Sequence, residues 1–141
     1  MSRERSLRSN FDFAKSVEVR WGDMDTLGHV NNAKYLTYTE SARIAFFDEV
    51  FAGDESFMNG QGPILAGISC NYHQQVHYPA MLEAAVGFKR MGTSSLVLAC
   101  PIFLCGQDEA VADVETTLVW FDYKAQKPMP VPQRLRDRFG V

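Results

Sequence analysis

The segment from Asn32 to about Val50 constrains the fold of this chain most. It carries a wide apolar surface at helical spacing, with Tyr35, Tyr38 and Ala42 along one stripe and Leu36, Thr39, Phe46 and Val50 beside it. Asn31 or Asn32 is the expected N-cap, and Gly53 is expected to end the helical region. Such a helix needs burial on most sides, which a curved β-sheet around it provides.

The rest of the chain is predicted to form strands. Alternating or strand-forming residues bounded by proline and glycine place them at 13–20, 64–78, 84–90, 94–104 and 111–121. The last has the clearest alternation, with Ala112, Val114, Thr116, Leu118 and Trp120 on one face. Prolines exclude 128–132 from a central strand, and a short basic helix is expected around 134–138. The sequence predicts an α+β fold with about five antiparallel strands, forming one domain over residues 11–141.

Composition limits the classes of partner and compartment. With 141 residues, 46% of them hydrophobic, and a net charge of -3, the chain has no general attraction for nucleic acid or anionic membranes. Its three cysteines have no metal-ligand or redox spacing, which favours reduced thiols and a cytoplasmic location. Residues 1–10 are polar and are expected to form a flexible tail. No apolar run is long enough to span a bilayer.

Residues 20–32, between the first strand and the helix, are unusually rich in polar groups. Two acids (Asp23 and Asp25), His29, two amides and two glycines lie within this short stretch. A turn needs only one or two such residues. The stretch therefore predicts a catalytic site, because it offers a carboxylate, an imidazole and the free N–H groups of a helix start.

Structural roles remain open for several of these residues. Asp23 is equally suited to a turn or a cap. His29 either orients the loop through a backbone hydrogen bond or contacts a substrate. Asn31 and Asn32 form an N-cap pair, which is compatible with substrate contact.

Two further groups of residues have alternative interpretations. His73 and His77 lie four apart on an expected strand and so share a face, but no third metal ligand is evident and ordinary hydrogen bonds also account for them. Tyr35, Phe46 and Phe47 suit the core, although an acyl tunnel beside the helix uses the same residue types.

A predicted hairpin follows the strand at 84–90. Lys89 and Arg90, followed by Gly92, Ser94 and Ser95, are suited to binding phosphates through charge and hydroxyl donors. The alternative is a solvated turn.

The order of strand, long helix and antiparallel strands resembles the hotdog fold, and in particular the acyl-CoA thioesterases typified by 4-hydroxybenzoyl-CoA thioesterase. The residues that carry this resemblance are Arg20-Trp21-Gly22-Asp23-Met24-Asp25, Gly28-His29-Val30-Asn31-Asn32 and Tyr35. Tyr78-Pro79, residues 90–95 and the proline-rich end extend it over nearly the whole chain. It implies hydrolysis of an acyl-CoA, with coenzyme A as part of the substrate and no metal or redox cofactor.

The resemblance also implies roles for individual residues. Asp25 corresponds to the catalytic carboxylate, acting as a nucleophile or as a general base. Backbone N–H groups at the helix start meet the oxyanion, and Gly28 lets the backbone approach the substrate. Some relatives have a histidine where this chain has Asn32, which leaves Asn32 as a polarising or water-holding amide.

Hotdog subunits join their sheets edge to edge, so the resemblance implies an active site shared within a homodimer or homotetramer. The aromatic residues Tyr35, Tyr38, Phe46, Phe47, Tyr72 and Trp120 suggest a pocket for a medium or long aliphatic chain or an aryl group. Two alternatives remain: a thioesterase acting on acyl carrier protein, and a non-catalytic acyl-CoA binding module.

Overall fold

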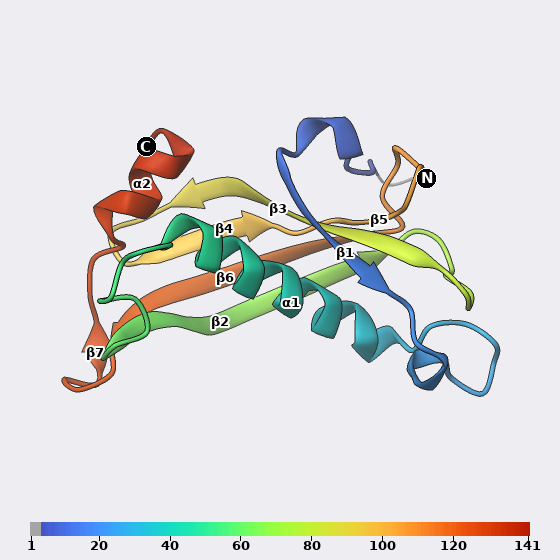
Figure 1. The fold of residues 1–141 in the computed structure, drawn as a ribbon, viewed down its shortest axis with the longest axis horizontal. Coiled ribbons are helices and arrows are strands. Elements are labelled where there is room, and N and C mark those ends of the chain that lie inside the picture. Colours follow the sequence, from blue (N-terminus) through green and yellow to red (C-terminus); the bar gives the residue numbers. More distant parts are fainter. Residues whose placement is uncertain (1–3) are drawn as a thin grey trace.

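The computed structural model describes residues 4–141 as one antiparallel sheet with a long helix across it (Figure 1). In chain order the elements are β1 (Phe13–Glu18), α1 (Asn32–Val50), β2 (Gln61–Tyr72), β3 (Met81–Met91), β4 (Ser95–Ala99), β5 (Ile102–Leu104), β6 (Ala112–Asp122), β7 (Lys127–Pro128) and α2 (Gln133–Phe139). Short 3-10 turns span Arg8–Asn10 and Trp21–Asp23.

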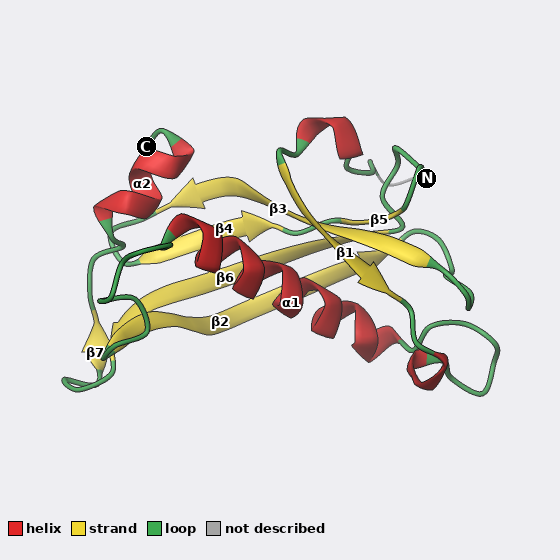
Figure 2. Cartoon of the chain, viewed as in Figure 1, coloured by secondary structure: helices red, strands yellow, loops and turns green. Residues whose placement is uncertain are grey.

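The sheet has the strand order β1-β3-β4-β6-β2, with β5 beside β3 and β6 and with β7 on β6. Helix α1 lies along one face, as Figures 1 and 2 show. The predicted alternation of β6 is confirmed, because Ala112, Val114, Thr116, Leu118 and Trp120 are all buried. A central helix against an antiparallel sheet is the α+β architecture that the sequence predicts.

Helix α1 has the predicted bounds. Asn31 is its N-cap, and the Asn31 Oδ1 accepts a hydrogen bond from the Ala33 N–H at 3.0 Å. Tyr38 and Phe46 are buried on the sheet side, whereas Ile44 is 56% exposed. In a single chain the sheet therefore covers only one side of α1, and an apolar position remains in solvent.

Each of the five predicted strands differs from the structure at one end or both, and two of them differ most. The expected strand 94–104 is split into β4 and β5 at Pro101, because proline has no N–H to donate to a ladder. The expected strand 64–78 begins at Gln61 and ends at Tyr72. It ends there because the N–H groups of His73 and Gln74 both donate to the Val111 carbonyl, which turns the chain out of the ladder.

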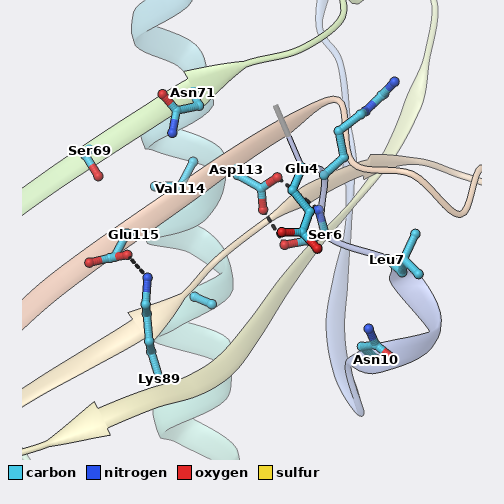
Figure 3. A pocket seen from close by; sticks show the side chains of 12 residues that line it. Glu4, Ser6, Leu7, Asn10, Ser69, Asn71, Lys89, Asp113, Val114 and Glu115 are labelled. Carbon is cyan, nitrogen blue, oxygen red and sulfur yellow. Dashed lines mark hydrogen bonds and ion pairs between the residues drawn. The ribbon is translucent and has the colours of Figure 1, made fainter. Parts of the chain in front are cut away.

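The first three residues of the predicted tail lie outside the described residues. From Arg5 onward the chain contacts the domain: Arg5 Nε donates to the Ala110 carbonyl at 2.8 Å, and the Ser6 hydroxyl donates to Asp113. These contacts border a polar hollow on the sheet face opposite α1, where Lys89 also pairs with Glu115 (Figure 3). At the other terminus, the predicted basic helix is α2.

Among residues 4–141, neither helix combines the length and apolar character that crossing a membrane requires.

Candidate active site

Residues 19–31, here named the Asp25 loop, are held by backbone hydrogen bonds within the loop. Met24 and Val30 form an antiparallel bridge, and the Asp25 N–H donates to the His29 carbonyl at 2.9 Å. The Val30 N–H donates to the Val76 carbonyl at 2.9 Å, which ties the loop to the segment after β2. Gly28 has a φ of 90°, a conformation that L side chains rarely adopt, so the turn requires glycine there.

The Asp25 carboxylate is held by donors of its own loop. Its Oδ1 accepts from the N–H groups of Leu27 at 2.8 Å and His29 at 3.4 Å, and its Oδ2 lies 3.1 Å from His29 Nδ1. Partial desolvation acts to raise the pKa of Asp25, but the N–H groups and the imidazole outweigh it and lower that pKa below its ordinary value. Asp25 is therefore an ionised, oriented carboxylate, 24% exposed, in the loop that leads into α1.

His29, Asn32 and Tyr35, three of the predicted site residues, lie close together. They line a hollow of about 380 Å³ together with Val30, Tyr72, His73, Gln74 and Gln75. The Tyr72 hydroxyl donates to the Asn32 carbonyl at 2.9 Å, and the Tyr35 ring meets the Tyr72 ring edge to face at 5.0 Å. The buried Tyr35 thus forms a wall of the hollow, and His29 connects the hollow to Asp25.

The prediction that His73 and His77 share a strand face is wrong, because β2 ends before them. His73 Nε2 lies 2.9 Å from Asp113 Oδ2, whereas His77 Nδ1 lies 2.9 Å from the Gly28 carbonyl. The part of the chain that the structure describes contains no group of three His, Cys, Asp or Glu side chains placed to hold a metal. Spacing alone gave no sign that His77 contacts the Asp25 loop.

Asp23 has the buried contacts of a structural residue. Its Oδ2 accepts from the Arg20 N–H at 3.0 Å and the Tyr38 hydroxyl at 2.8 Å, and Lys34 Nζ lies 3.9 Å from Oδ1. Burial acts to raise the pKa of Asp23, but the two hydrogen bonds and the positive charges of Lys34 and Arg20 lower it overall. Asp23 thereby fixes the Asp25 loop to α1.

We expect Asp23→Asn to destabilise the fold by about 1–3 kcal/mol at neutral pH, because the amide removes the negative charge beside Lys34 and Arg20 and places an NH2 group near the Lys34 ammonium. The folded-state pKa is lowered, so this stabilisation is present above the unfolded pKa and is lost as pH falls through the folded value. Thermal unfolding of both proteins from pH 7 into the acid range checks this. A difference that stays constant below pH 4 contradicts it.

The predicted phosphate-binding hairpin lies at the opposite end of the sheet. Strand β3 starts beside Glu18 and runs for 11 residues to Met91, which separates Arg90 from the Asp25 loop by roughly 30 Å. Arg90 is 65% exposed and lies 3.8 Å from Glu115, while the Gly92 carbonyl accepts from Arg136 at 2.7 Å. Within one chain, the structure does not bring Arg90, Gly92, Ser94 and Ser95 to Asp25.

A second cavity lies between α1 and β2 and is mostly apolar. It measures about 400 Å³ and is lined by Glu40, Arg43, Ile44, Phe47, Asp48, Phe57, Met58, Pro63, Leu65 and Leu118. Phe47 therefore belongs to both the core and a cavity wall. The sequence interpretation did not single out Arg43, which is 7% exposed. Its only sequence signal is a positive charge directly after Ala42 of the apolar stripe.

Comparison with known proteins identifies the family. The model described as the thioesterase-like superfamily matches residues 19–139. Long-chain acyl-CoA thioesterase FadM of Escherichia coli (strain K12) is 26% identical over 122 residues, which are 86% of this chain and 92% of that protein.

Solved structures agree. The PA5185 protein from Pseudomonas aeruginosa strain PAO1 has 29% identity and a TM-score of 0.87, covering 97% of this chain and 95% of that one. A thioesterase from Thermus thermophilus, solved with coenzyme A and Zn, has 29% identity and a TM-score of 0.76 over 92% of each chain. Because the family match spans the Asp25 loop, α1 and strands β2 to β7, the chain belongs to the thioesterase-like superfamily.

Proposed function

We propose that this protein is an acyl-CoA thioesterase that hydrolyses its substrate to a free acid and coenzyme A. The observation that carries the proposal is the ionised Asp25 carboxylate, held by Leu27 and His29 in the loop that leads into α1. The names of two relatives support the substrate class, since FadM is a long-chain acyl-CoA thioesterase and the Thermus thermophilus enzyme was solved with coenzyme A. The proposed chemistry uses no metal or redox cofactor.

Asp25 acts in one of two ways. As a nucleophile, its oxygen attacks the thioester carbon and expels the coenzyme A thiolate, and water then cleaves the mixed anhydride. As a general base, it takes a proton from the water that attacks the same carbon. In both routes His29 Nδ1 orients the carboxylate, and the Asn32 amide polarises the carbonyl or holds the water.

The start of α1 offers a backbone N–H group as a hydrogen-bond donor to the developing oxyanion. The Ala33 N–H donates to the Asn31 side chain and the Lys34 N–H to the Asn31 carbonyl, so both are already occupied. We therefore assign the oxyanion contact to the Asn32 N–H, where the positive end of the helix dipole also favours negative charge.

Strand β2 is the surface on which we propose that two subunits join. It forms one edge of the sheet, is 12 residues long and contains no charged residue, whereas the opposite edge strand β1 carries Lys15 and Glu18. Long edge strands without charges readily pair with another strand. Ile64 and Leu65 on β2 are also 39% and 47% exposed, which is consistent with an interface.

Antiparallel pairing of two β2 strands brings the separated parts of the site together. The Asp25 loop lies at the Tyr72 end of β2, and the β3–β4 hairpin lies at the Gln61 end, because Ile64 and Ser95 both pair with Val119. Pairing sets the Tyr72 end of one strand beside the Gln61 end of its partner. The smallest active unit is then a homodimer, and a homotetramer consists of two such pairs.

If the hairpin of one subunit binds coenzyme A phosphates for the Asp25 loop of the other, Arg90→Ala should raise KM several-fold and leave kcat nearly unchanged. The contact is the same in the ground state and the transition state, so only binding is weakened. Steady-state kinetics with an acyl-CoA checks this. An unchanged KM assigns Arg90 to its Glu115 pair in a solvated turn.

The experiment that tests the function is kcat/KM across acetyl-, hexanoyl-, decanoyl-, palmitoyl- and benzoyl-CoA, with detection of the free thiol. Each buried methylene contributes about 0.8 kcal/mol, so kcat/KM should rise several-fold per two carbons until the cavity is filled. A maximum at acetyl-CoA contradicts an apolar pocket. Turnover only with protein-borne pantetheine favours a thioesterase for acyl carrier protein, and tight binding without turnover favours a binding module.

A further inference from the structure

Arg43 is a buried charge that lacks a protein counter-ion. Among residues 4–141 its guanidinium makes one hydrogen bond, from Nη1 to the Thr39 hydroxyl at 3.3 Å, and no carboxylate lies within ion-pairing distance. Buried arginines almost always have carboxylate or multiple hydrogen-bond partners, because an uncompensated buried charge is strongly unfavourable. The other N–H groups of the Arg43 guanidinium have no acceptor among the described residues, so an acceptor from outside this chain is expected.

Arg43 borders the cavity between α1 and β2, and its positive charge also acts to lower the pKa of the buried Cys100 thiol, which burial raises. Arg43 lines this cavity with apolar side chains such as Phe47, Leu65 and Leu118. Among residues 4–141, one side-chain nitrogen or oxygen is both fully buried and without a hydrogen-bond partner, and it belongs to Arg8. The unpaired nitrogens of Arg43 are therefore not fully buried. Arg43 is thus a donor at the wall of an otherwise mostly apolar cavity.

The charges of the cavity select the kind of group that Arg43 can receive. Glu40 and Asp48 also line it, so two acidic residues and one basic residue border the cavity. This excess of negative charge disfavours a carboxylate in the cavity. A neutral oxygen accepts from the guanidinium without that repulsion.

We propose that Arg43 selects acyl groups that carry a hydroxyl or keto oxygen within an otherwise apolar chain. This inference rests on the proposed thioesterase function and names its substrate class. Arg43 follows Asn32 by 11 residues, which is about 16 Å along α1. For a thioester bound at the start of α1 in the same subunit, the selected oxygen therefore lies far along the acyl chain and not beside the thioester. Antiparallel pairing of β2 also places the partner's helix start beside this cavity.

The test compares decanoyl-CoA with its hydroxy isomers, in which the hydroxyl moves along the chain, and with ketodecanoyl- and decanedioyl-CoA. One charge-assisted hydrogen bond should raise kcat/KM for the best hydroxy or keto isomer by roughly tenfold or more over decanoyl-CoA. In Arg43→Met, which has a side chain of similar length, this ratio should fall to about one. Arg134→Met, at an exposed residue outside the cavity, should keep the ratio of the wild type.

Three results overturn the inference: no preference for an oxygen-bearing isomer, a preference for decanedioyl-CoA, or an unchanged ratio in Arg43→Met. A dimer lost in Arg43→Met with the ratio unchanged instead assigns Arg43 to a subunit contact. If Arg43→Met does not fold, Arg43→Lys should retain a reduced preference, because it keeps the charge but not the planar fork.

Binding separates this inference from the proposed function. Calorimetric titration of the wild-type protein with decanoyl-CoA and with the hydroxy isomers reports on Arg43 even if no thioester is hydrolysed. Tighter binding of one hydroxy isomer without turnover supports the role of Arg43 and contradicts a hydrolase. Equal binding of all the thioesters with turnover supports a hydrolase and contradicts the role of Arg43.

Discussion

Asp25→Asn should lower kcat by at least about a hundredfold, the usual scale for losing a proton-transfer group or a nucleophile. The amide is nearly isosteric, so it retains the volume of the side chain and removes the charge that either route needs. In the wild type, the lowered pKa keeps Asp25 ionised, and activity should persist to pH values below the ordinary range of an aspartate. Single-turnover kinetics on an acyl-CoA and a pH profile measure both effects.

The control for this substitution is Asp12→Asn, which makes the same change at an exposed carboxylate outside the Asp25 loop. Both variants should retain the wild-type oligomeric state and melting temperature. His29→Asn should be less impaired than Asp25→Asn if Asp25 itself reacts, because His29 then only orients it. Near wild-type turnover by Asp25→Asn would falsify both proposed routes.

Ala66→Glu should separate the proposed dimer and abolish most of its activity. Ala66 is exposed in the middle of β2, at the bulge between Leu65 and Gly67, so a single chain accommodates the change. In an antiparallel pair related by a two-fold axis, the two new carboxylates lie near each other. Such like-charge contacts cost several kcal/mol, which raises the dimer dissociation constant by at least about a hundredfold.

Ser16→Glu is the matched control, since it adds the same charge to an exposed position on β1, the opposite edge of the sheet. It should remain dimeric and active. Sedimentation analysis of each variant, with thioesterase activity measured at the same protein concentration, tests the pair of predictions. A dimeric and fully active Ala66→Glu protein places the interface elsewhere.

Elements with a regular local pattern could be predicted from the sequence. The period of α1 and the alternation of β6 each report which face is buried, and the N-cap at Asn31 needs only the next two residues. The end of β2 was not predictable in this way. It depends on the Val111 carbonyl, which captures the N–H groups of His73 and Gln74 from a distant part of the chain.

In the candidate site, too, contacts between residues close in sequence could be predicted and contacts between distant segments could not. The contacts of Asp25 with Leu27 and His29 lie within five consecutive residues, so the sequence places them together. His77 reaches Gly28 across the fold, and Arg43 is recognisable only from its burial and missing counter-ion. The hairpin at Arg90 is distant within one chain, because β3 carries it to the far end of the sheet.

The crossed pairing of the strands also affects how the chain emerges during synthesis. Strand β1 pairs with β3, and β2 pairs with β6, so β2 has no partner until residues 112–122 have been made. Until then the nascent polypeptide exposes an uncharged segment rich in strand-forming residues, which favours aggregation. Faster synthesis of residues 73–122, or a chaperone that covers residues 61–72, should therefore increase the yield of folded protein.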